Sequence, residues 1–169
     1  LYSKSVNDGD IMPSTEQPYP TIHFNDRQPV SVIEPDLSEG PWIAGGAALK
    51  WFQQQPVMDS DIDIFCRSRS QAQAVIDRIK GYNRYQIKHE SDNAVTISYH
   101  DKDQWSNSWN LQVITKNFYP DIDSVINQFD ITVCQIGTTG TEWVLGRNTA
   151  RDIRTRTLAF TERRGPDSV

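Results

Sequence analysis

The segment from Ser60 to Cys66 constrains the fold more than any other part of the chain. It alternates acidic and aliphatic residues, and side chains in a strand point to opposite faces of the sheet in turn. Asp61 and Asp63 would therefore share one face, while Ile62 and Ile64 occupy the other. We predict a strand that is buried on its aliphatic side and carries carboxylates on the opposite side. Such a strand requires both a sheet and a hydrophobic core.

Apolar periodicity predicts further strands and helices that alternate from Trp42 onward. The predicted strands are 42–45, 60–66, 94–99, 111–115, 131–136 and 142–145. The predicted helices are 47–55, 70–80, 123–129 and 148–157, with Ser70 and Asp123 as N-caps and Gly81 as a stop. This alternation predicts an α/β or α+β domain, in which helices flank a mixed β-sheet.

The first 40 residues have a different composition. Five prolines lie among polar residues, which disfavours helix and leaves little apolar surface to bury. We predict an extended N-terminal arm that wraps a neighbouring molecule, in which 30–33 could add an edge strand. The predicted organisation is an arm at 1–40, a domain at 41–160 and a tail at 161–169.

The charge of the chain limits its partners. The net charge is −5, which argues against a broad, non-specific grip on nucleic acid. Six arginines between 147 and 164 make the charge asymmetric, and they form either a basic patch or a solvated helix face. No stretch approaches the ~20 apolar residues of a membrane helix, and no apolar run follows the N-terminus as in a signal peptide. We expect no membrane partner and a location in the cytoplasm or within a viral particle.

The carboxylates of the acidic strand repel one another unless water, basic side chains or a cation neutralises them. Mg²⁺ is typically held by one or two carboxylates together with substrate phosphates. If the strand that follows Asp130 lies beside the acidic one, Asp130 joins Asp61 and Asp63 around the same ions, as in two-metal phosphoryl transfer. The alternatives are a charged strand edge that resists aggregation and an Asp130 that only caps an element.

Gly45 and Gly46 separate a predicted strand from a predicted helix. Paired glycines allow close backbone approach, and the free N–H groups at a helix start favour phosphate, although most such pairs are ordinary turns. Lys50 is the nearest cation and would reach a triphosphate only if its helix turns it inward.

Three motifs together resemble the DNA polymerase β-type nucleotidyltransferase superfamily, including the head of CCA-adding enzymes. They are Ala44-Gly45-Gly46, Asp61-Ile62-Asp63-Ile64 and Phe129-Asp130-Ile131. The resemblance covers roughly 42–136. The interval after Gly46 is longer than usual, which leaves Asp59 with Asp61 as an alternative pair, and the Arg that follows Gly-Gly in CCA-adding enzymes is missing.

The resemblance implies a transferase that moves a nucleoside monophosphate from a nucleoside triphosphate to an RNA, protein or small-molecule acceptor. Asp61, Asp63 and Asp130 would be catalytic and bind Mg²⁺ or Mn²⁺, while Gly45, Gly46 and Lys50 would bind the nucleotide. The alternative is a non-catalytic structural or assembly protein that reuses the fold, for example in a phage particle. A resemblance to nucleotidyltransferase-like proteins of tailed phages, over 129–135 and 150–153, favours that setting.

Overall fold

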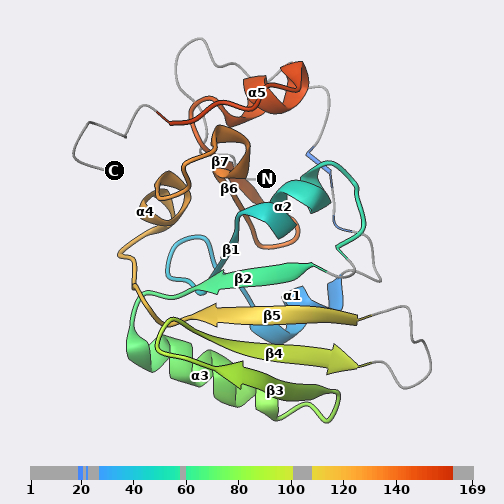
Figure 1. Cartoon of the computed structure of the whole chain (residues 1–169), viewed down its shortest axis with the longest axis vertical. Helices are drawn as coiled ribbons and strands as arrows, with labels where there is room; N and C mark the ends of the chain where they lie inside the picture. The colour runs from blue at the N-terminus through green and yellow to red at the C-terminus, as the bar shows by residue number, and fades with distance from the viewer. Residues whose placement is uncertain (1–18, 21, 23–26, 58–59, 101–107, 162–169) are drawn as a thin grey trace.

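A seven-stranded mixed sheet forms the centre of the protein (Figure 1). The computed structural model describes residues 19–20, 22, 27–57, 60–100 and 108–161 of the 169-residue chain. The strands are β1 (Trp42–Ala44), β2 (Asp61–Phe65), β3 (Tyr85–Glu90), β4 (Ala94–His100), β5 (Ser108–Ile114), β6 (Ile136–Thr138) and β7 (Trp143–Leu145). Their order is β3-β4-β5-β2-β1-β6-β7, and every pairing is antiparallel except that of β2 with β5.

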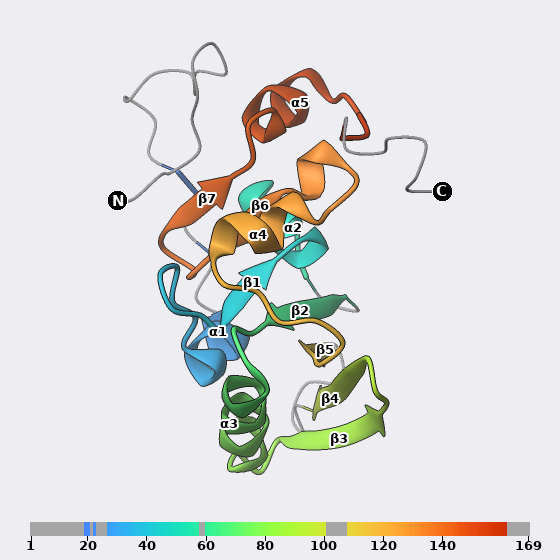
Figure 2. The same cartoon turned by 90° about the vertical axis from the view of Figure 1, so that its left-hand side faces the viewer.

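Among the described residues, five α-helices and one short 3-10 helix flank this sheet, and Figure 2 shows the α-helices around it. They are α1 (Arg27–Ile33), α2 (Gly46–Phe52), α3 (Arg69–Lys80), α4 (Ile122–Asn127), η2 (Thr132–Cys134) and α5 (Thr149–Thr155). The predicted fold class, a mixed sheet with flanking helices, is therefore confirmed. Within the described residues, each helix is too short and too polar to cross a lipid bilayer.

Helix α3 follows its predicted amphipathic pattern. Its buried residues are Ala72, Val75, Ile76 and Ile79, which recur at the spacing of one helix face. The helix begins slightly earlier than predicted, because the side chain of Ser68 rather than Ser70 accepts the N–H of Gln71 at 3.2 Å. The buried stripe fixes α3 against one face of the sheet.

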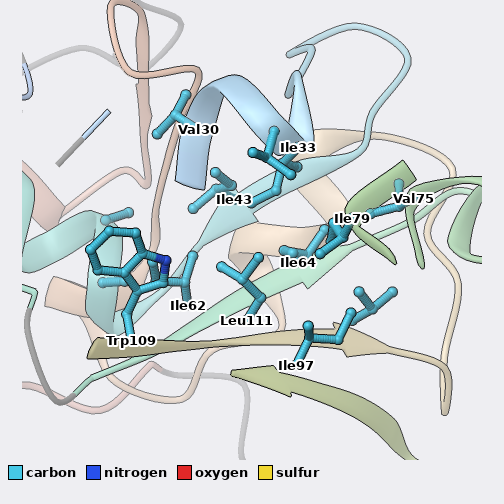
Figure 3. Close-up of a cluster of buried hydrophobic side chains, with 14 of the residues drawn as sticks. Val30, Ile33, Ile43, Ile62, Ile64, Val75, Ile79, Ile97, Trp109 and Leu111 are labelled. Carbon is cyan, nitrogen blue, oxygen red and sulfur yellow. The ribbon is translucent and has the colours of Figure 1, made fainter. Parts of the chain in front are cut away.

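The two faces of the sheet carry separate hydrophobic clusters. Alternation along β1 sends Ile43 into the larger cluster, and Trp42 and Ala44 into the smaller one. The larger cluster joins Ile62 and Ile64 of β2 to apolar residues of α1, α2 and α3 (Figure 3). The smaller cluster lies under α4. Both faces of β1 are thus buried, whereas half-buried and buried residues alternate along β5, which is covered on one face only.

Residues 30–33 form part of α1, so the predicted edge strand at this position is wrong. Val30, Val32 and Ile33 are all buried, and α1 packs against α3, so tertiary packing outweighs the local preference for extended backbone. Pro29 lies in the first helical turn, where a missing N–H costs nothing. Residues 1–18 of the predicted arm lie outside the described residues.

The predicted strand at 131–136 is also wrong. Residues 132–134 form η2, and the strand begins only at Ile136. Strand β3 was not predicted, because five of its six residues are exposed and its sequence therefore lacks an apolar alternation. β7 and α5 lie where the sequence predicted a strand and a helix.

Candidate functional site on strand β2

Asp61 opens β2 on the sheet face that α1, α2 and α3 leave uncovered. Its side chain is exposed, and both of its carboxylate oxygens accept hydrogen bonds from the parallel neighbour β5. Asn110 donates to Oδ1 at 3.0 Å, and Gln112 donates to Oδ2 at 3.3 Å. Both carboxylate oxygens of Asp61 therefore have hydrogen-bond partners within the fold.

Asp63 points to the same face but is more deeply buried. Burial first, and the nearby charge of Asp61 second, together raise the pKa of Asp63 to about 6. Within the described residues, no side chain donates a hydrogen bond to the Asp63 carboxyl. In this pair, amide groups hold the carboxylate of Asp61, and burial raises the pKa of the Asp63 carboxyl.

Asp130 does not join this pair. It is exposed, lies in the bend before η2, and its backbone carbonyl accepts the N–H of Thr161 at 2.8 Å. In the described part of the chain, no group of three or more His, Cys, Asp or Glu side chains could hold one metal ion. The predicted convergence fails because the residues after Asp130 form η2, and because β1 lies between β2 and β6. Asp59 lies outside the described residues.

Gly45 has a conformational and steric reason to be glycine. Its φ is +92°, which L side chains rarely adopt, and a Cβ at this position would lie 2.8 Å from the ring of Phe129. Gly46 is the exposed first residue of α2, and a Cβ there would meet open space. The Gly-Gly pair is therefore explained by a sharp turn from β1 into α2, packed under an aromatic ring.

Lys50 lies in the last turn of α2, where its Nζ contacts the hydroxyl of Ser60. This contact ties α2 to the start of β2. The nucleotide-binding roles of Gly45, Gly46 and Lys50, and the metal-binding roles of the three acids, stay predictions.

Sequence reasoning missed Asn110 and Gln112, the two residues that hold Asp61. A pattern for them was present, because Asn110-Leu111-Gln112-Val113 alternates polar and apolar residues in the same way as 61–64. The parallel pairing sets Asp61 opposite Asn110 and Asp63 opposite Gln112. The polar face of β5 therefore continues the acidic face of β2.

Fold and site together define a small α+β domain with an acidic, amide-clamped strand on an uncovered sheet face. Residues 23–156 match the family described as Gabija anti-defense 2 family protein. Because this match covers most of the chain, the protein belongs to the Gabija anti-defense 2 family.

A curated relative, the protein named Gabija anti-defense 2 of Bacillus phage SPbetaL7, is 32% identical over 92 residues. The matched region covers 54% of this chain and 20% of the relative. The chain therefore corresponds to about a fifth of the length of that phage protein.

This family membership corrects the resemblance to DNA polymerase β-type nucleotidyltransferases and the nucleotidyl transfer inferred from it. The family that matches is an anti-defense family, and it spans the whole region from which the resemblance was drawn. The motifs have structural explanations. Two amides hold Asp61, Gly45 makes a turn beneath Phe129, and no metal-holding group forms among the described residues. The shared three-acid metal group inferred from the same motifs is corrected by the described residues, whereas Mg²⁺ or Mn²⁺ as a cofactor stays a prediction.

Proposed function

We propose that this chain belongs to a phage protein that counters the Gabija defence by binding a defence protein, without catalysing a reaction. The family match over 23–156 carries the proposal. The phage relative, which is named Gabija anti-defense 2, supports it. The non-catalytic alternative that the sequence left open fits this family better than transfer chemistry does. Action in the cytoplasm of the infected cell fits it better than a place in the virion.

The arrangement on β2 supports a non-catalytic role. Both oxygens of Asp61 accept hydrogen bonds from amide groups of the fold, so its charge has partners without a bound cation. The Asp63 carboxyl is partly desolvated beside it. The two acids therefore shape a polar sheet face, which is the kind of surface that a protein interface uses at its rim.

Phage plating on bacteria that carry the Gabija system tests the proposal. Cells would express this chain, the full-length SPbetaL7 protein as a positive control, or an empty vector. We expect this chain to restore plaque formation by a Gabija-sensitive phage. The chain matches only about a fifth of the relative, so the full-length SPbetaL7 protein also tests whether parts outside the match are needed.

Two measurements separate binding from catalysis. An inhibitor that binds must be present at about the molar amount of its target, so inhibition of purified Gabija proteins should titrate to completion near one inhibitor per target. The double substitution Asp61→Asn and Asp63→Asn should leave protection intact. Complete inhibition at a small fraction of the target concentration, or loss of protection in a folded double variant, would refute the non-catalytic role.

A further inference from the structure

Helix α5 and the segment after it concentrate positive charge in an otherwise acidic chain. Between 146 and 161 there are four arginines and one acid, whereas the whole chain has a net charge of −5. The acid, Asp152, is buried. All four arginines are exposed, and Leu158 and Phe160 beside them are also exposed. We call Arg147, Arg151, Arg154, Arg156, Leu158 and Phe160 the α5 surface.

Hydrogen bonds hold the inward face of α5 against the rest of the domain. Asp152 accepts a hydrogen bond from the hydroxyl of Thr132 at 2.5 Å, and the hydroxyl of Thr149 donates to the backbone carbonyl of Thr132 at 2.8 Å. Thr149 and Asp152 are both almost fully buried. Because these contacts fix one side of the helix, the opposite side is held toward solvent.

That opposite side carries the arginines. Arg151 and Arg154 lie three residues apart in α5, which places them on one helical face, and Arg147 lies in the turn just before the helix. Arg151 also donates to the buried carboxylate of Asp152 at 3.0 Å, and this hydrogen bond orients its guanidinium. Arg156 follows at the C-cap in a left-handed conformation, where the chain leaves the helix. The positive charges therefore form a stripe with a fixed orientation.

The apolar end of the surface is fixed by backbone hydrogen bonds. The N–H of Thr132 donates to the carbonyl of Ala159 at 3.0 Å, and Ile131 forms a bridge with Phe160. In this extended segment Leu158 and Phe160 share one side, and they remain 79% and 69% exposed. These are the two most exposed large hydrophobic side chains of the described residues. The pairing at Ala159 and Phe160 holds this segment on the domain while both side chains remain exposed.

We propose that the α5 surface is the docking site for an acidic protein surface that carries an apolar pocket, and this rests on the proposed function. Arginines beside exposed aromatic and aliphatic side chains are typical of the energetic centres of protein interfaces. The positive stripe complements an acidic partner. Nucleic acid fits less well, because the net negative charge of the chain opposes a phosphate backbone and Leu158 offers nothing to a base.

Purified Gabija proteins are the probe, and their binding to the whole chain is measured by calorimetry or interferometry at low and physiological salt. One variant combines Arg154→Ala with Arg156→Gly. It should fold at least as well as the parent, because glycine suits the left-handed position 156. A second variant combines Leu158→Ser with Phe160→Ser. Each variant should raise the Kd at least tenfold. Higher salt should weaken the binding of the parent more than the binding of the arginine variant.

Matched controls lie elsewhere on the protein. Lys80→Ala with Lys116→Ala removes the same charge from exposed positions, and Lys80, like Arg154, lies in the last turn of a helix. Tyr82→Ser with Ile87→Ser removes two other exposed hydrophobics, in the α3–β3 region at the far end of the molecule from α5 (Figure 1). Both controls should bind as the parent does.

The outcomes separate the two proposals. Loss of binding in the α5 variants alone supports the surface. Equal binding by α5 variants and controls overturns the surface and leaves the proposed function standing. A parent chain that binds no Gabija protein overturns both. If the parent instead binds an oligonucleotide through the arginines and no protein, the partner class is overturned.

Discussion

Replacing Asp63 by Asn should stabilise the protein, and the gain should depend on pH. Burial first, and the charge of Asp61 second, raise the pKa of Asp63 from its ordinary 3.8 to about 6. One pKa unit corresponds to about 1.4 kcal/mol, so this rise sets a ceiling of about 3 kcal/mol on the cost of ionising Asp63 in the folded state. Because the carboxyl keeps partial contact with solvent, screening reduces the expected cost to about 1–2 kcal/mol.

The sign of the pH dependence follows from the direction of the shift. Below about pH 4 the carboxyl is protonated in both folded and unfolded chains, so the parent and Asp63→Asn should differ least there. Between about pH 4 and 6 the unfolded chain releases this proton while the folded parent keeps it, so the parent loses stability that the Asn variant keeps. The gain of the variant should therefore grow between pH 4 and 6 and then stay constant.

Urea unfolding at a series of pH values measures this difference as a change in the free energy of unfolding. Asp92→Asn is the matched control, because it removes the same charge from an exposed position between β3 and β4. The reasoning fails if Asp63→Asn destabilises the protein at pH 7.5, or if its gain is the same at pH 4 and pH 7.5.

Three further substitutions test the contacts around the site and α5. Asp61→Asn should lower the pKa of Asp63 without restoring it to 3.8, since only the charge is removed and burial remains; NMR titration of the Asp63 carboxyl measures this. Gly45→Ala should cost about 2 kcal/mol or more in thermal or urea unfolding, because φ is +92° and Phe129 blocks a Cβ; an unchanged midpoint would contradict the predicted strain. Thr132→Val should cost about 1–3 kcal/mol by leaving the buried Asp152 with one donor fewer, whereas Thr132→Ser should keep most of the stability.

The sequence predicted those elements whose apolar pattern is strong. The alternation of Asp61 to Ile64 marked β2, and the stripe from Ala72 to Ile79 marked α3, because burial on one face imposes these periods. β3 has no such period, since it lies at the sheet edge with most of its side chains in water. Helix α1 was not predicted for another reason. The burial of its three apolar residues depends on α3, which is distant in sequence.

The candidate site was predictable only in part, for a related reason. Local sequence set Asp61 and Asp63 on one face, and this holds in the structure. Whether such a pair is neutralised by a cation or by protein donors depends on the neighbouring strand. Here that neighbour is β5, 49 residues further along the chain where Asn110 meets Asp61. No local pattern states which strand becomes the neighbour.

The amide clamp therefore gives a general reason why a pair of strand carboxylates does not by itself indicate catalysis. Carboxylates on one strand face repel one another, and any donor that satisfies them relieves the cost. A metal ion does so while leaving coordination positions open to a substrate, whereas Asn110 and Gln112 use both oxygens of Asp61. Their side chains come from a strand paired in parallel register with β2, so they are held as firmly as the sheet itself. In this protein Asp61 is partnered from within the fold, whereas Asp63 beside it is partly buried and has no side-chain donor among the described residues.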